Sequence, residues 1–240
     1  RILGLLTHVD NTLAGLVAQG LGLTVPTKLD PPMNMSVPAD GNIKHFQPRP
    51  LEPSLDRSPA LSMASTVKNG IQTRKIAILL AEGFEDADVA GMKKALAAAG
   101  AQGKIIAPHL GSVKGAKGTE LPVDFSLLTA GSVLFDAVYL PGGARSVEVL
   151  IKIGKALHFV TEAYTHCKTI AATGASRDLL ARALVGPDEM TKHEAQRTPF
   201  DADPGIILDA AATPKTAAQF IAAIGRHRHW EREAKGQVPA

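Results

Sequence analysis

Apolar runs alternate with helical patterns through the second part of the chain. Residues 76–80 form a continuous apolar run, which is typical of a strand buried on both faces of a parallel sheet. Residues 86–99 then carry apolar side chains at helical spacing, and Gly100 supplies a stop signal. The pair predicts the start of a βαβ unit. In such folds the chemistry lies beyond the carboxyl ends of the strands, so we expect the loop 82–85 to face a crevice.

The same alternation recurs along the rest of the chain. A glycine-rich stretch at 111–123 is typical of a hairpin, and Ser176 is a plausible N-cap for the helix that follows it. Strands alternating with helices five times predict an α/β doubly wound sheet. The further strands are expected at 104–107, 136–140, 169–173 and 205–208, and the further helices at 147–167, 177–184 and 215–224.

The residues before position 75 follow a different pattern. Residues 1–23 have apolar positions compatible with an amphipathic helical segment, which needs a packing partner. Residues 24–74 contain eight of the 16 prolines and no periodic run, so we expect an extended arm. Its dispersed apolar side chains predict that it lies on a surface. These side chains are Met33, Met35, Phe46, Leu51, Leu55, Leu61 and Met63.

Composition narrows the classes of function. The 240 residues are 45% hydrophobic and 20% charged, which suits one substantial globular domain, or one domain with an appendage. A net charge of +3 without a dense Lys/Arg block disfavours a nucleic-acid partner. The sequence has no run of 18 or more apolar residues, so a membrane span is not expected. The chain starts at Arg1 and its first methionine is Met33, which indicates a fragment whose natural start precedes it. The compartment, cytoplasmic or secreted, is therefore left open.

Several familiar sites of doubly wound folds are disfavoured by the loops. The first strand is followed by AEGFED, whose carboxylates would repel the phosphates of NAD or a flavin. A phosphoacceptor receiver needs an aspartate after the third strand, where Tyr139 to Pro141 stand instead. The acidic cluster of Glu82, Glu85, Asp86 and Asp88 is able to bind a hard cation, but we favour helix-start electrostatics.

The turn at 172–176 carries the clearest chemical signal. It is a sharp strand-to-helix turn of the kind that presents a nucleophile, and we call it the elbow. The amides after Gly142 are expected to form an oxyanion hole beside it. The reactive group is missing, because Thr173 and Ser176 have no histidine near them in sequence.

Two other reactive residue types have simpler interpretations. Cys167, the single cysteine, precedes the fourth strand and is expected at the opposite edge of the sheet as a small core residue. It also excludes a disulfide framework and a cysteine-rich zinc site. His227 and His229 are two residues apart, so we expect them in a solvated, charged tail that begins at 226 rather than on a metal.

Three motifs resemble the PfpI/ThiJ group of the class I glutamine amidotransferase-like superfamily. They are EGFED after the first strand, LPGG after the third and IAATGAS after the fourth, and the resemblance covers residues 75–224. It implies a cysteine and a histidine at the elbow, supported by a carboxylate from the first helix. Here the matching positions hold Gly174, Ala175 and Asp88. The catalytic pair is absent, so the elbow with Thr173, and the turn of Gly142 and Gly143, are interpreted as vestigial.

The whole chain is similar to the C-terminal region of large-subunit haem catalases. The similarity rests on LAGLVAQGLGL, the Pro-rich arm through SPALSM and the nucleophile-free domain. It implies that residues 1–23 end the catalase helical region, that 24–74 cross the tetramer surface and that 75–225 form a flavodoxin-like domain before the tail 226–240. The implied parent enzyme disproportionates hydrogen peroxide with haem. No catalytic residue, cofactor or metal is expected in this part.

The resemblance also implies partners and leaves alternatives open. The expected partners are the rest of the catalase chain and neighbouring subunits of a homotetramer, with no nucleic acid or membrane. A chaperone-like module that binds unfolded client proteins through the apolar arm is a further hypothesis. A free-standing PfpI-like hydrolase or glyoxalase with a replaced nucleophile is the alternative, and such an enzyme has no evident use for the arm.

Overall fold

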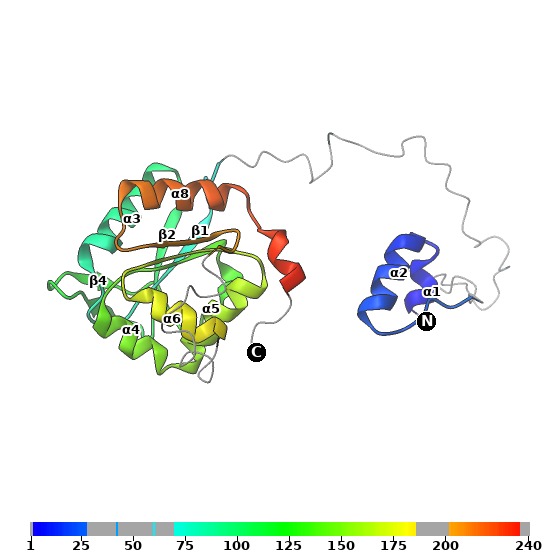
Figure 1. Cartoon of the computed structure of the whole chain (residues 1–240), viewed down its shortest axis with the longest axis horizontal. Helices are drawn as coiled ribbons and strands as arrows, with labels where there is room; N and C mark the ends of the chain where they lie inside the picture. Colours follow the sequence, from blue (N-terminus) through cyan, green and yellow to red (C-terminus); the bar gives the residue numbers. More distant parts are fainter. Residues whose placement is uncertain (1, 28–41, 43–59, 61–69, 186–201, 236–240) are drawn as a thin grey trace. The chain divides into compact units, whose positions relative to one another are not determined.

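The computed structural model describes residues 2–27, 42, 60, 70–185 and 202–235. The chain divides into a helical unit within residues 1–65 and an α/β unit within residues 66–240 (Figure 1). The predicted arm lies outside the described residues, apart from its ends and two isolated positions. Among the helices that the structure describes, none has the length and apolar character needed to cross a bilayer.

Two short helices make up the described part of the first unit. These are α1 (Ile2–Leu6) and α2 (Asn11–Gly20), separated by a turn. The Asp10 side chain caps α2 by accepting a hydrogen bond from the Leu13 amide at 2.8 Å. Ala14 and Ala18 are buried, whereas Leu13 and Leu16 are exposed. The apolar spacing therefore produces helices that bury Leu3 but leave several large apolar side chains exposed.

A six-stranded sheet organises the α/β unit, with the strand order β5-β2-β1-β6-β7-β8. Every neighbouring pair in it is parallel, so the predicted doubly wound, mostly parallel fold is confirmed. The sequence pattern missed β5, which is too short to show a period. The strands are β1 (Lys75–Leu79), β2 (Gln102–Ala107), β5 (Phe125–Ser126), β6 (Ala137–Leu140), β7 (Thr169–Thr173) and β8 (Ile206–Asp209).

The predicted hairpin is also confirmed. Strands β3 (Ser112–Lys114) and β4 (Glu120–Pro122) pair antiparallel as a separate two-stranded sheet. Its loop returns toward the start of the first long helix, because the Ala116 amide donates to the Phe84 carbonyl at 2.9 Å. The hairpin therefore packs against the loop that follows β1.

Helices cover both faces of the sheet (Figure 1). One face packs against α3 (Asp86–Ala98) and α8 (Pro214–Gly225), and the other against α4 (Ala144–Ile151), α5 (Gly154–Thr165) and α6 (Ser176–Val185). Alternate residues of β1 belong to the two cores: Ala77 and Leu79 to one, Ile76 and Ile78 to the other. Burial on both faces explains the continuous apolar runs.

The helix predicted over 147–167 is wrong as a single element. It is two helices, which are separated at Lys152 and Ile153, and the first begins earlier, at Ala144. Ile153 has extended backbone angles and precedes Gly154, where the second helix starts. Both helices bury a face on the same core, so the apolar spacing continues across the break and conceals it.

The prediction that both tail histidines are solvated is wrong for His229. Its side chain is only 1% exposed, its ring Nε2 lies 2.9 Å from the Thr169 hydroxyl, and its amide donates to the Cys167 carbonyl at 2.8 Å. Burial, with the nearby Arg232 charge, lowers the pKa of His229 to about 4. His227 is exposed, so the prediction is confirmed for that residue.

Two side chains of the tail, those of His229 and Arg232, are buried against the amino end of β7, although His229 Nδ1 and Arg232 Nε and Nη1 have no hydrogen-bond partner among the described residues. Arg232 lies over the Tyr164 ring, 4.7 Å from its centroid, and donates to the Lys168 carbonyl. The segment forms a short 3-10 helix, η4 (Trp230–Lys235). Gly205 allows the approach, since a Cβ there would lie 2.1 Å from the His229 ring. A run of charged residues does not reveal such contacts.

Candidate functional site

The carboxyl ends of β1, β6 and β7 lie side by side at the middle of the sheet. Strand β1 is followed by α3, and its neighbours in the sheet are β2 on one side and β6 on the other. This arrangement is the topological switch point of a doubly wound fold. The loops here carry Asp88 from α3, Gly142 after β6 and Thr173 at the end of β7. The structure therefore brings together the three loops that the sequence singled out.

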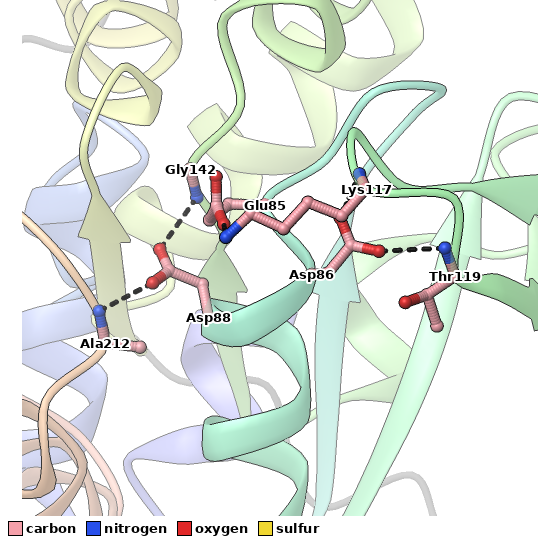
Figure 2. A network of polar contacts seen from close by, with 7 residues as sticks. All are labelled: Glu85, Asp86, Asp88, Lys117, Thr119, Gly142 and Ala212. Atoms are coloured by element: carbon pink, nitrogen blue, oxygen red, sulfur yellow. Dashed lines mark hydrogen bonds and ion pairs between the residues drawn. The ribbon is translucent and has the colours of Figure 1, made fainter.

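A closed hydrogen-bond network joins these loops. Figure 2 shows the part of it that links Asp88 to Gly142 and Ala212. The Thr173 hydroxyl donates to Asp88 Oδ2 at 2.6 Å, and the Gly142 amide donates to Thr173 Oγ1 at 3.0 Å and to Asp88 Oδ2 at 3.3 Å. The other Asp88 oxygen accepts from the Ala212 amide at 2.9 Å. The Tyr139 hydroxyl lies 2.9 Å from Thr173 Oγ1. Since the single Thr173 proton points to the carboxylate, Tyr139 must donate to Thr173.

The members of this network are packed inside the protein. Thr173 and Tyr139 are fully buried, and Asp88 is almost so. Burial raises the pKa of Tyr139 well above its ordinary value, and the Asp88 charge raises it further, although the Thr173 hydrogen bond opposes this. Tyr139 therefore stays protonated as a donor. Hydrogen bonds from Thr173, Gly142 and Ala212 stabilise the buried carboxylate.

The elbow itself presents backbone where an enzyme of this shape presents a nucleophile. Gly174 has φ +54° and is exposed, and its amide donates to the Asp209 carbonyl at 3.0 Å. A Cβ at this position would only make ordinary contacts, 3.4 Å from the Ala210 carbonyl and 3.7 Å from the Gly142 Cα. Space for a side chain exists, yet Gly174 and Ala175 provide no acid, base or nucleophile.

The glycine turn after β6 is directed toward the interior. Because the Gly142 amide donates to Thr173 and Asp88, it does not contribute to an oxyanion site. The Gly142 carbonyl accepts from the Glu85 amide at 2.7 Å. Gly143 has φ +121°, and a Cβ there would lie 2.4 Å from the Gly83 carbonyl, so two loops meet where only glycine fits.

The prediction that Ser176 is the N-cap of α6 is wrong. It is the first residue of α6, and its buried hydroxyl donates to the Pro141 carbonyl of the neighbouring loop. The hydroxyl thus joins α6 to the end of β6. Like Thr173, Ser176 has its proton committed to the protein's own acceptor, so neither hydroxyl is a poised nucleophile.

The four acidic residues of the first loop bond to separate donors. Asp86 accepts from the amides of Lys117 and Thr119 in the hairpin, at 2.8 and 2.9 Å. Hydrogen bonds from Thr119 and then Lys117 lower the pKa of Asp86 to about 2. The Glu85 carboxylate lies 3.2 Å from Lys117 Nζ, and Glu82 accepts from the Lys114 amide at 3.2 Å.

Asp86 and Asp88 stand in the first turn of α3, as the helix-start interpretation requires. Their strongest contacts, however, fix the hairpin and the loop at Ala212, which no local pattern reveals. Among the described residues no group of three His, Cys, Asp or Glu side chains converges on a point that suits a metal ion.

Neither tyrosine of the chain fits a role as a haem ligand. The Tyr139 hydroxyl is held by Thr173, and the Tyr164 hydroxyl donates to buried Asp203. An axial tyrosinate needs an oxygen that faces an open slot. Neither of these two tyrosines is therefore placed to ligate a haem iron.

Cys167 lies at the amino end of β7, whereas Gly174 follows its carboxyl end. The thiol is buried, and its sulfur lies 3.8 Å from the Thr165 carbonyl. The prediction that Cys167 is a core residue away from the elbow is confirmed.

The fold of the α/β unit is shared with solved structures. The crystal structure of a ThiJ/PfpI domain protein from Brachyspira murdochii matches with a TM-score of 0.52 and 20% identity, covering 65% of this chain and 96% of that one. At this identity the likeness shows the fold alone: a DJ-1/ThiJ/PfpI-type, flavodoxin-like domain.

The sequence comparisons are more specific. A family model described as the C-terminal domain found in long catalases matches residues 72–234, and this chain belongs to that family. Catalase HPII of Pseudomonas aeruginosa is 34% identical over 213 residues, covering 88% of this chain and 28% of the relative. Catalase HPII of Mycobacterium avium is 35% identical over 240 residues, covering 98% and 30%. The chain thus spans less than a third of these relatives.

Proposed function

We propose that this chain is the C-terminal domain of a large-subunit catalase and serves as a non-catalytic stability and assembly domain. Hydrogen peroxide disproportionation, with its haem, is assigned to the parts of the parent enzyme outside this chain. The proposed partners are those parts and the neighbouring subunits of a homotetramer. The family match and the chain's small share of each relative's length support this assignment.

The observation that carries the non-catalytic role is the elbow. Gly174 and Ala175 stand where a nucleophile and base would be needed, and the Thr173 hydroxyl below them is tied to Asp88. A buried group whose proton and lone pairs are already used stabilises the loops but has nothing left for a substrate.

Two measurements test this proposal. The catalase polypeptide that carries this chain should show a haem Soret band and peroxide decomposition. The 240-residue chain alone should show neither, and should not consume methylglyoxal or hydrolyse p-nitrophenyl acetate above the buffer rate. If the chain alone turns over either substrate, and Asp88→Asn abolishes this with the fold intact by circular dichroism, the hydrolase or glyoxalase alternative is correct and our proposal fails.

A chaperone-like role is a second candidate, favoured by apolar side chains on the small unit. Leu16 and Leu21 of this unit are exposed, and further apolar residues occur in the arm. Such surface can bind unfolded chains. We expect the full chain to suppress the heat-induced aggregation of a client enzyme, and a version beginning at Gly70 to lose this effect. Equal behaviour of the two versions would contradict a role for the helices and the arm.

A further inference from the structure

Polar contacts hold the C-terminal tail against the amino end of the sheet. After α8 the chain turns back, and the described part of the tail, residues 226–235, ends in η4 (Figure 1). The His229 amide donates to the Cys167 carbonyl at 2.8 Å, and its ring Nε2 lies 2.9 Å from the Thr169 hydroxyl. The large apolar side chain of this segment, Trp230, is 63% exposed. Docking of the tail therefore depends on polar groups more than on apolar burial.

The surroundings of His229 suit only the neutral form of its ring. The side chain is 1% exposed, and a Cβ at Gly205 would lie 2.1 Å from the ring, so the ring packs directly on backbone. Burial first, and then the charges of Arg232 and Arg226, lower the pKa of His229 to about 4, although Glu231 opposes this shift. A proton added to the docked ring would be buried beside cations.

That proton would add to a surplus of buried positive charge. At the amino end of β7 the ammonium of Lys168 and the guanidinium of Arg232 are buried, whereas the buried carboxylate of Asp203 already accepts the Tyr164 hydroxyl. Arg232 Nε and Nη1 have no hydrogen-bond partner among the described residues. The titratable and charged groups of this region are Arg226, Arg228, Glu231 and Arg232 from the tail, Tyr164 from α5, Cys167 and Lys168 before β7, Asp136 before β6, Asp203 before β8 and Arg74 before β1.

The tail also lies over the single thiol of the chain. Cys167 is 2% exposed, and its carbonyl accepts from the His229 amide. The Arg232 guanidinium packs against residues on both sides of Cys167, over the Tyr164 ring at 4.7 Å and on the Lys168 carbonyl. Burial lowers the pKa of Arg232, and the nearby Cys167 thiol is the first of the groups that oppose this shift. Release of the tail would therefore uncover the thiol.

We propose that the C-terminal tail is an acid-released latch, in which protonation of His229 undocks residues 226–235 and uncovers the amino end of β7 with the Cys167 thiol. The device is separate from the role in stability and assembly. Its chemistry needs only the protein and protons.

The direction of the pH effect follows from the two states of His229. Its pKa is about 4 in the docked tail and 6.5 when the ring is free, so docking is fully stabilised above about pH 6.5 and loses stability as the pH falls toward 4. One such group raises the release constant by about 20-fold between pH 7 and pH 5. Carboxyl groups with ordinary pKa values of about 4 remain mostly ionised in this range.

Labelling of Cys167 with 4,4′-dithiodipyridine tests the proposal in the 240-residue chain. Each rate is divided by that of glutathione at the same pH, which removes the effect of thiol ionisation. The ratio should rise by about 20-fold from pH 7 to pH 5, with unchanged circular dichroism. His229→Gln keeps a neutral hydrogen-bonding side chain that does not titrate, and should reduce the rise to less than about three-fold. His227→Gln is the matched control, since His227 is exposed on the same tail, and should keep the full rise.

Urea separates release of the tail from global unfolding. Local release exposes little surface, so labelling at pH 5 should hardly depend on urea well below the unfolding midpoint. A constant ratio between pH 7 and pH 5, an equal rise in His229→Gln, a lost rise in His227→Gln, or a urea dependence as steep as that of global unfolding would each overturn the proposal.

The pH profile of the unsubstituted chain decides the outcome if His229→Gln is already labelled rapidly at pH 7. A rise that begins near pH 6.5 and approaches ten-fold per pH unit, as one proton requires, supports the latch. A rise that begins only below pH 5 belongs to a carboxyl group and overturns it.

Discussion

The Thr173→Val substitution tests whether the network below the elbow stabilises the domain. Valine keeps the shape of threonine and removes only the hydroxyl, which donates to Asp88 and accepts from Gly142 and Tyr139. All four groups are buried. The expected effect is therefore a loss of hydrogen bonding rather than a loss of packing.

The magnitude follows from the partners that remain. A buried hydrogen bond to a carboxylate contributes about 1.5–3 kcal/mol, and a buried hydroxyl left without a partner costs about 1–3 kcal/mol. Asp88 keeps the Ala212 and Gly142 amides, so its own loss is partial. Tyr139 loses the acceptor of its hydroxyl. We expect Thr173→Val to lower the free energy of unfolding by about 3–5 kcal/mol.

The assay is denaturant unfolding of the 240-residue chain, followed by circular dichroism. Thr161→Val is the matched control, because Thr161 is also buried and its hydroxyl donates one hydrogen bond, to the Ala183 carbonyl at 2.9 Å. That variant should lose about 1 kcal/mol. The difference between the two variants isolates the additional contacts of Thr173. Equal losses in both, or a Thr173→Val protein as stable as the parent, would refute the proposed role of the network.

Three further predictions concern pH and the packing of the tail. The pKa of Asp86 is depressed to about 2, so its stabilising contribution is complete above the unfolded value of 3.8 and is lost as the pH falls toward 2; unfolding measured against pH should show this slope, and Asp86→Asn should flatten it. Gly205→Ala should destabilise the chain by about 1–3 kcal/mol or more and loosen the tail, because the added Cβ would clash with the His229 ring. Gly111→Ala is the control, since Gly111 also has a positive φ but nothing lies within 4 Å of its Cβ position, so this variant should show the backbone cost alone. Limited proteolysis and unfolding measurements check both variants. Burial and then the Arg228 charge lower the pKa of Lys168 to about 8, so the unfolded state binds more protons between about pH 8 and 10.5 and stability should rise with pH there; Lys168→Met should remove that rise in unfolding experiments between about pH 8 and 9.5.

The sequence by itself determined the central strands and the lack of a side chain at Gly174. Strands β1, β6 and β7 are buried on both faces, and such burial leaves a direct signature because every residue must be apolar or small. The identity of Gly174 is enough to exclude it as a nucleophile, because a residue without a side chain cannot attack a substrate wherever the turn lies.

Only the tertiary structure decided which polar groups meet. Thr173 bonds to Asp88, 85 positions earlier in the chain, and to Tyr139, 34 positions earlier, because β1, β6 and β7 are neighbours in the sheet. His229 is buried because the tail folds back on the amino end of β7. Local pattern reports the burial of apolar positions within strands and helices. The burial of His229 and the hydrogen-bond partners depend on strand order and loop approach, which no spacing of residues encodes.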